Sequence, residues 1–172
     1  MLFQKILDIF SKNNNIKTLF LVDILYMKDL NAIYDFKNGD FIIRQLDSIL
    51  KTNIKELIKE ELKRNIYINI KNTHADVFEI YLLDDLSIEE IVIVKNIIYE
   101  SIVSNNFKLL DNYGTINIDI TIGCAKSEDQ HIKIYAEKAL YNAKLNFIHY
   151  MYYDSFLYKN ESVNENLLDV LN

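Results

Sequence analysis

The stretch from Asp23 to Asp40, "DILYMKDLNAIYDFKNGD", brings together residue types that contact metal ions and nucleotides. Asp23 follows the apolar run "TLFLV" and is expected at the end of a buried strand, where a carboxylate can hold a hard metal ion. Lys28 and Asn31 fall on a short helical segment, and Asp40 is expected to begin the next helix. An Asn and an Asp that converge on one pocket can recognise a purine edge by hydrogen bonds. The same residues are also ordinary local choices, Asp40 as a helix N-cap among them, so their spacing alone does not decide between the two interpretations.

A second stretch, "NTHADVFEIYL" (72–82), places turn-forming residues before alternating apolar ones. Together with the alternating segment "NIYINIK" (65–71), it predicts a β-hairpin whose bend is "NTHAD". His74 and Asp76 lie in that bend. A metal-ligand or general-base role for His74 has little support, because no second His or Cys follows at ligand spacing. A solvated turn residue is the favoured interpretation.

The remaining elements follow from hydrophobic periodicity. Strands are expected over 18–22, 65–71, 77–83, 115–123 and 149–153, and helices over 3–10, 26–34, 41–63, 87–104 and 131–146. The helix that begins near Ser87 carries the capping box "SIEE". This order predicts an α+β sandwich, in which helices cover a mostly antiparallel sheet. No internal boundary is expected before about residue 155, which gives one domain over 1–154 and an extension over 155–172.

Composition excludes several classes of protein. The chain has 172 residues and a net charge of −6 without a basic run, which argues against binding to duplex nucleic acid. The single Cys124 is expected as a small buried thiol. No apolar run approaches the roughly 20 residues of a membrane span, and no signal-peptide layout begins the chain. These features predict a cytoplasmic domain without direct membrane contact, and a membrane-anchored parent protein remains compatible with them.

In their order and spacing these pieces resemble the GGDEF domains, the diguanylate cyclases of cyclic di-GMP signalling. The stretch from Asp23 to Asp40 follows the family pattern without a gap, and "HADVF" (74–78) stands where the family has its Gly-Gly-Asp-Glu-Phe turn. "TIGCA" (121–125) and "ALYNAK" (139–144) match two further motifs. The resemblance covers about residues 2–154. It implies a central five-stranded sheet flanked by helices, of the palm-type nucleotide cyclase kind.

The resemblance also implies a site. In the family, Mg²⁺ ions bridge the triphosphate of GTP, and two half-sites face each other across a homodimer. Carried over position by position, Asp23 and Asp76 are the metal ligands, and the nucleotide-binding residues are Asn31 and Asp40 for guanine with Lys28 and Lys144 for phosphate. GTP, with Mg²⁺ as its cofactor, is therefore the expected ligand.

Other positions depart from the family. Val77 replaces the second acidic residue of the turn, and His74 and Ala75 replace its glycines. Phe147 and Ile148 stand where the family has Gly-Arg, so a cation facing the phosphates is lost. We therefore expect no catalytic residues and a regulatory domain that binds GTP without turnover. A pure dimerisation or structural module and an active cyclase with an atypical turn are the alternatives.

The ends of the chain suggest a larger protein. The lead-in helix of the family is missing before Met1, and "SFLYKNESVNENLLDVLN" continues past the expected end of the sheet. In the family, a helix at this place commonly leads into an EAL-type phosphodiesterase domain. The expectation is an excised domain whose partner is a neighbouring EAL-type or sensor domain. A C-terminal helix that folds back onto the sheet is the alternative.

Overall fold

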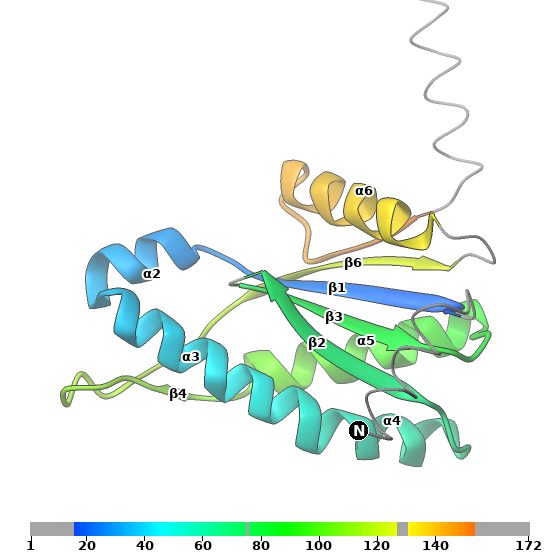
Figure 1. Cartoon of the computed structure of the whole chain (residues 1–172), viewed down its shortest axis with the longest axis horizontal. Helices are drawn as coiled ribbons and strands as arrows, with labels where there is room; N and C mark the ends of the chain where they lie inside the picture. Colours follow the sequence, from blue (N-terminus) through cyan, green and yellow to red (C-terminus); the bar gives the residue numbers. More distant parts are fainter. Residues whose placement is uncertain (1–15, 75, 127–130, 154–172) are drawn as a thin grey trace, which may run out of the picture.

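A computed structural model describes residues 16–74, 76–126 and 131–153. Its main sheet has five strands in the order β2-β3-β1-β6-β7 (Figure 1). They are β1 (Thr18–Ile24), β2 (Ile68–His74), β3 (Val77–Leu82), β6 (Ile120–Lys126) and β7 (Tyr150–Tyr152). All neighbours are antiparallel except β6 and β7, which are parallel. The predicted five-stranded, mostly antiparallel α+β sheet is therefore confirmed. The predicted helix over 3–10 and the extension over 155–172 lie outside the described residues.

Helices cover the two faces of this sheet unequally. One face packs against α2 (Met27–Tyr34), α3 (Phe36–Ile49), α4 (Lys55–Leu62) and α5 (Ile88–Val103). The other face carries α6 (Ile132–Leu145), which lies across β6 and β1 (Figure 1). The alternation of β1 divides its side chains between these layers, with Phe20 and Val22 in the larger core and Leu19 and Leu21 under α6.

The central strand β1 fixes where the site can form. All seven of its residues are buried, because β3 and β6 pair with its two edges and helices pack over both faces of the sheet. The register places Asp23 opposite Val77 of β3 and Thr121 of β6. Since Asp23 shares the face of Leu19 and Leu21, its carboxylate points to the α6 side at the end of the strand.

The long helix begins five residues earlier than the sequence predicts. Asp35, not Asp40, is the N-cap of α3, and its carboxylate accepts a hydrogen bond from the backbone N–H of Asn38 at 2.9 Å. The prediction that Asp40 starts the helix is wrong. Asp35 and Asp40 offer the same capping chemistry, and Asp35 is used because its carboxylate accepts the hydrogen bond from Asn38. The Asn38 amide also donates to the carbonyl of Tyr34 at 2.7 Å.

Buried positions recur every four residues along this helix. A regular α-helix turns once per about 3.6 residues, so such a stripe would drift around the helix axis. A π-helical stretch, η1 (Leu50–Ile54), supplies a wider turn between α3 and α4 and keeps the stripe facing the core. Leu57 lies off this stripe and is 43% exposed. The fully buried stripe is Ile42, Leu46, Leu50, Ile54 and Ile58.

The predicted strand over 115–123 is two strands. β5 (Thr115–Ile116) pairs with β4 (Phe107–Lys108) in a separate two-stranded sheet, and β6 begins only at Ile120. The isoleucines nevertheless share one face, because Ile116, Ile118 and Ile120 all pack into the larger core. Alternation therefore identified the buried side chains correctly and missed the break in the strand.

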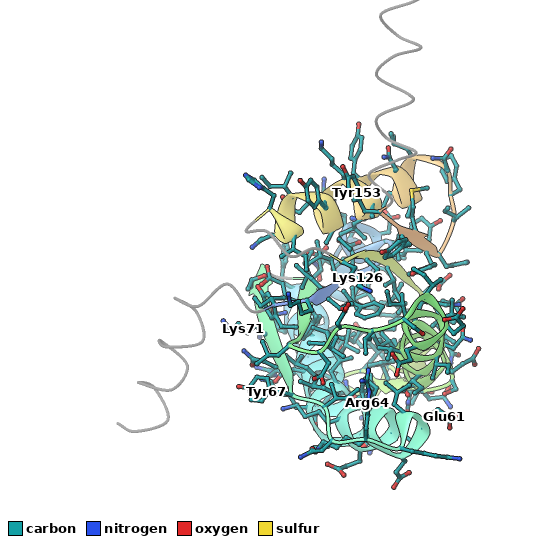
Figure 2. The ribbon with its side chains drawn as sticks, turned by 90° about the vertical axis from the view of Figure 1, so that its right-hand side faces the viewer. Glu61, Arg64, Tyr67, Lys71, Lys126 and Tyr153 are labelled. Atoms are coloured by element: carbon teal, nitrogen blue, oxygen red, sulfur yellow. The ribbon has the colours of Figure 1, made fainter. Side chains whose placement is uncertain are left out.

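The hairpin and the helix that follows it agree with the sequence more closely. β2 and β3 pair from Ile68–Leu82 to His74–Val77, so the strands extend further into the predicted bend than expected. Ser87 caps α5 through the predicted capping box with Glu90. Arg64 makes an ion pair with Glu90 at 3.0 Å, which joins the end of α4 to the start of α5. In Figure 2, Lys71 lies on β2 at the edge of the sheet, and Tyr67 directly precedes that strand. In the part of the chain that the structure describes, no helix is both long enough and apolar enough to span a bilayer.

Candidate functional site

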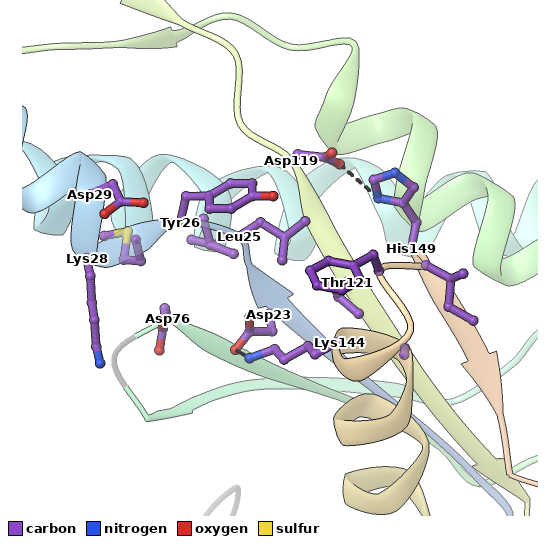
Figure 3. Close-up of a pocket in the computed structure, with 15 residues that line it drawn as sticks. Asp23, Leu25, Tyr26, Lys28, Asp29, Asp76, Asp119, Thr121, Lys144 and His149 are labelled. Atoms are coloured by element: carbon purple, nitrogen blue, oxygen red, sulfur yellow. Dashed lines mark ion pairs between the residues drawn. The ribbon is translucent and has the colours of Figure 1, made fainter.

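A cavity of about 600 Å³ opens where β1 ends and α2 begins (Figure 3). This volume lies within the range of small-molecule sites. Four segments contribute to its wall: the end of β1 with α2, the β2–β3 turn, the start of β6, and the end of α6 with the loop after it. The charged and polar side chains in that wall are Asp23, Tyr26, Lys28, Asp29, Asp76, Asp119, Thr121, Lys144 and His149.

Asp23 and Lys144 form the ion pair at the centre of this wall. The Nζ atom of Lys144 lies 2.7 Å from Oδ1 of Asp23, and the side chains are 42% and 7% exposed, respectively. Burial raises the pKa of Asp23, while the hydrogen bond and the charge of Lys144 act in the opposite direction without cancelling the effect. The strand end thus holds a carboxylate that is costly to ionise and is kept next to a single mobile cation.

Asp76 lies beside this pair in the β2–β3 turn. The backbone N–H of Ile24 donates to the carbonyl of Asp76 at 3.2 Å, which ties the turn to the end of β1. The negative charge of Asp76 adds to the rise in the pKa of Asp23, so the two carboxylates are close enough to repel each other. The backbone of His74 ends β2, but its side chain and Ala75 fall outside the description, and the predictions for them stay predictions.

The two carboxylates suit a magnesium ion only if further ligands, such as phosphate oxygens, complete its coordination. Across residues 16–74, 76–126 and 131–153, no group of three or more His, Cys, Asp or Glu side chains is arranged to hold a metal ion. Mg²⁺, however, commonly binds one or two carboxylates together with substrate phosphates and water. Asp23 and Asp76 therefore fit a metal ion that binds together with a triphosphate, whose negative charge the metal would neutralise. By themselves they do not form a closed metal site.

The expected guanine-contacting residues lie outside the cavity wall. Lys28 lines the cavity, and Asn31, three residues later on α2, shares its helix face. The Asn31 carboxamide lies against Gly39: a Cβ atom at Gly39 would come within 1.9 Å of Oδ1 of Asn31. That oxygen is buried and has no hydrogen-bond partner among the described residues. Asp40 is exposed on α3, directly after Gly39.

Two of the positions that depart from the GGDEF pattern line this cavity, and a third lies beside Asp23 in the sheet. Val77 is paired with Asp23 in the sheet, so an apolar side chain stands beside the metal-ligand candidate. Phe147 is 92% exposed and Ile148 42% exposed, and both line the cavity in the loop after α6. Phe147 and Ile148 therefore add apolar surface to this side of the cavity, and neither supplies a cation.

Three polar residues of the wall, Asp29, Asp119 and His149, were missed by the sequence analysis. Asp119 lies just before β6, and its carboxylate is 3.3 Å from Nδ1 of His149, which begins the return to β7 (Figure 3). The His149 ring nitrogen also lies 3.2 Å from the carbonyl oxygen of Ile120. Asp119 sits at a polar position of an alternating run, which is what a solvent-facing strand residue would show. Only the contact with His149, thirty residues further along the chain, distinguishes Asp119 from such a residue, and this contact is visible in the structure alone.

Comparisons with known proteins agree with the fold. No protein-family model matches the chain, and no curated protein sequence matches it. Solved structures do match. The GGDEF domain of TpbB (YfiN) from Pseudomonas aeruginosa has a TM-score of 0.66 and 17% identity, covering 80% of this chain and 76% of that one. The GGDEF domain of DgcB from Caulobacter crescentus, solved in complex with c-di-GMP, has a TM-score of 0.64 and 16% identity over 80% of this chain and 78% of that one.

A third match is an EAL/GGDEF domain protein from M. capsulatus, with a TM-score of 0.64 and 18% identity over 83% of this chain and 88% of that one. The mixed sheet and the helices on its two faces agree with these matches. The chain has the fold of a GGDEF domain, as predicted.

Proposed function

We propose that this chain is a GGDEF domain that binds GTP and acts as a regulatory module in cyclic di-GMP signalling without making cyclic di-GMP. The observation that carries this proposal is the composition of the cavity wall. Asp23, Asp76, Lys28 and Lys144 gather around one opening, which suits a metal-bound triphosphate. In contrast, Val77 and Ile148 place apolar side chains at positions where a cyclase needs charge.

The physical reason for lost turnover is electrostatic. Phosphoryl transfer depends on positioning the reactants and neutralising charge that develops in the transition state. With Val77, one carboxylate that could hold a metal or a proton is absent. Ile148 supplies no cation at its position, and loss of a comparable arginine costs about 10³-fold or more in rate. Binding depends less on these positions, because the remaining lysines still attract the phosphates.

As a regulatory module, the domain would act by biasing a neighbour. Ligand binding can change the conformation of a neighbouring domain only if this domain has two conformations that differ in their affinity for the ligand, each coupled to a different state of the neighbour. An EAL-type or a sensor domain is the proposed neighbour, and a second copy of the chain is the proposed partner for dimerisation. The M. capsulatus match, an EAL/GGDEF domain protein, supports the first of these.

A thermal-shift measurement tests the binding. We expect the melting temperature to rise with GTP and Mg²⁺, and to rise less with ATP and Mg²⁺ at the same concentration. At a ligand concentration of 100 times Kd, binding adds about 2.7 kcal/mol to stability. An unchanged melting temperature at saturating GTP would contradict the proposal.

Incubation of concentrated protein with GTP and either Mg²⁺ or Mn²⁺, followed by chromatography, tests the absence of turnover. We expect no cyclic di-GMP above a control without protein. Accumulation of the product would show that the alternative, an active cyclase with an atypical turn, is correct.

A ligand-free dimerisation or structural module is the second candidate. It is favoured by the position of Asn31 and Asp40, which lie outside the cavity wall and so do not frame a base pocket together with Asp23. This candidate predicts no thermal shift with any nucleotide, and a dimer that forms equally well with and without GTP.

A further inference from the structure

The contact between Lys144 and Asp23 joins a buried carboxylate to a partly exposed cation. Asp23 is held in the central strand with its side chain 7% exposed, whereas the Lys144 side chain is 42% exposed in the last turn of α6. The ammonium therefore reaches the carboxylate through a flexible, partly solvated stem. It can leave without any backbone movement, while Asp23 cannot follow it.

We propose that Lys144 occupies the place of the metal ion on Asp23, so that a divalent metal and a nucleoside triphosphate bind only together. This inference rests on the proposed function, because it concerns the same cavity. In the unliganded protein, Lys144 neutralises Asp23. With both ligands bound, Asp23 would hold the metal, and the Lys144 ammonium would contact the phosphate oxygens instead.

Binding of a metal ion alone is unfavourable, because the metal loses more interactions than it gains. It must displace the Lys144 ammonium, which then stands near a dication, and in return it gains only Asp23 and Asp76 among the carboxylates at the end of β1. The other acidic residues of the wall do not complete a site, since the described residues contain no cluster of three or more potential ligands. Mg²⁺ and Mn²⁺ also give up hydration water only for several oxygen ligands.

A triphosphate alone is disfavoured for the opposite reason. The cavity wall carries four carboxylates, Asp23, Asp29, Asp76 and Asp119, against two lysines, Lys28 and Lys144. With Lys144 held by Asp23, Lys28 is the only lysine of this wall left to face the phosphates. Coulomb repulsion from Asp29 and Asp76 then opposes the incoming anion. Metal and triphosphate together remove both obstacles, because each supplies the opposite charge that the other lacks.

The first experiment uses Mn²⁺ alone as the probe. Its binding is followed by electron paramagnetic resonance of the free ion and by calorimetry, in wild type, Lys144→Met and the control Lys138→Met. Lys138 is exposed on the same helix, and no ion pair involves it among the described residues. We expect weak Mn²⁺ binding in wild type and the control, and about ten- to hundred-fold tighter binding in Lys144→Met, the scale of one charged hydrogen bond.

Equal Mn²⁺ affinity in wild type and Lys144→Met would overturn the proposal, as would an equal gain in Lys138→Met. Lys144→Arg keeps the cation and should exclude Mn²⁺ as wild type does. If Lys144→Arg binds Mn²⁺ as tightly as Lys144→Met, the charge is not responsible and the proposal fails. None of these measurements involves a nucleotide, so they decide the role of Lys144 even if GTP does not bind.

The second experiment measures GTP binding with Mn²⁺ and with EDTA. Thermodynamic linkage requires that GTP tighten Mn²⁺ binding by the same factor by which Mn²⁺ tightens GTP binding. We expect this factor to be large in wild type and at least tenfold smaller in Lys144→Met. Equal GTP affinity in Mn²⁺ and in EDTA for wild type would overturn the inference and leave the proposed function standing. No GTP binding under either condition would contradict the proposed function itself.

Discussion

Gly123→Ala should separate α6 from the sheet that it covers. Gly123 lies in β6 directly beneath the helix, and a Cβ atom there would come within 2.4 Å of the backbone nitrogen of Leu140 and 2.6 Å of the carbonyl oxygen of Ala136. Both atoms belong to the α6 backbone, which cannot turn aside as a side chain can. An ordinary contact is about 3.5 Å, so the helix must move outward by about 1 Å.

The cost follows from the packing that this movement loosens. Leu140, Ala136 and Ala139 form much of the smaller core between α6 and β1. Adding a methyl group to a well-packed core typically costs about 1–3 kcal/mol, and here the helix backbone itself is in the way, so we expect the upper part of this range. The shift should also lengthen the contact of 2.7 Å between Lys144 and Asp23.

Urea unfolding, monitored by far-UV circular dichroism, measures the change in free energy. Gly114→Ala is the matched control, because it makes the same chemical change at a residue with a φ of +87° and no atom within 4 Å of the added Cβ. Its cost should be about 1 kcal/mol, due to backbone strain alone. A loss for Gly123→Ala no larger than that of the control would refute the argument that α6 packs directly on the glycine.

Three further predictions concern charged residues. Lys133→Met should destabilise the protein by about 1–3 kcal/mol, because it removes the ion pair of 2.6 Å to the buried Glu79; a loss below about 0.5 kcal/mol in urea unfolding would contradict this. Burial is the largest influence on Glu79 and opposes its ionisation, but the hydrogen bond and charge of Lys133, with the hydrogen bonds from Tyr81 and Thr73, together outweigh it and lower the pKa of Glu79. The stability due to these partners should be present above the ordinary value of 4.5 and lost as the pH falls through the lowered pKa, so the difference in unfolding free energy between wild type and Lys133→Met should narrow in acid. Asp40→Ala should reduce the preference for GTP over ATP in thermal shifts. Its cost in unfolding free energy should stay within about 0.5 kcal/mol, because Asp35 and not Asp40 caps α3. Unchanged discrimination between the nucleotides would show that Asp40 does not contact the base. Asp23→Asn should leave the free energy of unfolding unchanged or raise it by up to about 2 kcal/mol while weakening the response to GTP and Mg²⁺, and a clear loss of stability would assign Asp23 to the fold.

Local chemistry explains which elements the sequence predicts well. The capping box at Ser87 and the apolar stripe of "ALYNAK" involve residues within one turn of each other, so their geometry follows from the sequence. The strand β1 is predicted equally well, since a continuous apolar run is what a strand buried on both faces requires.

Features that depend on distant parts of the chain were not predictable. The alternating run over 115–123 contains no residue that marks the break before β6; the break arises because β5 pairs with β4 instead. Similarly, Asp35 adopts a φ of 76° and a ψ of 167° at the N-cap of α3, a conformation that glycine would have signalled more clearly. The contacts of Lys144 with Asp23 and of His149 with Asp119 join side chains far apart in the sequence, and no spacing rule implies them.

Helix α6 makes two ion pairs to buried carboxylates on one face of the sheet. The pKa of one carboxylate is lowered and that of the other is raised. Lys133 and its neighbours lower the pKa of Glu79 despite its burial, so this pair favours the folded state. Burial raises the pKa of Asp23 in spite of Lys144, so ionised Asp23 opposes folding. An apolar residue at the end of β1 would serve the core better than this aspartate does. The stability of the fold therefore accounts for Glu79 and leaves Asp23 unexplained, and a buried carboxylate at a cavity, held by a cation that can leave, is the arrangement expected of a ligand site.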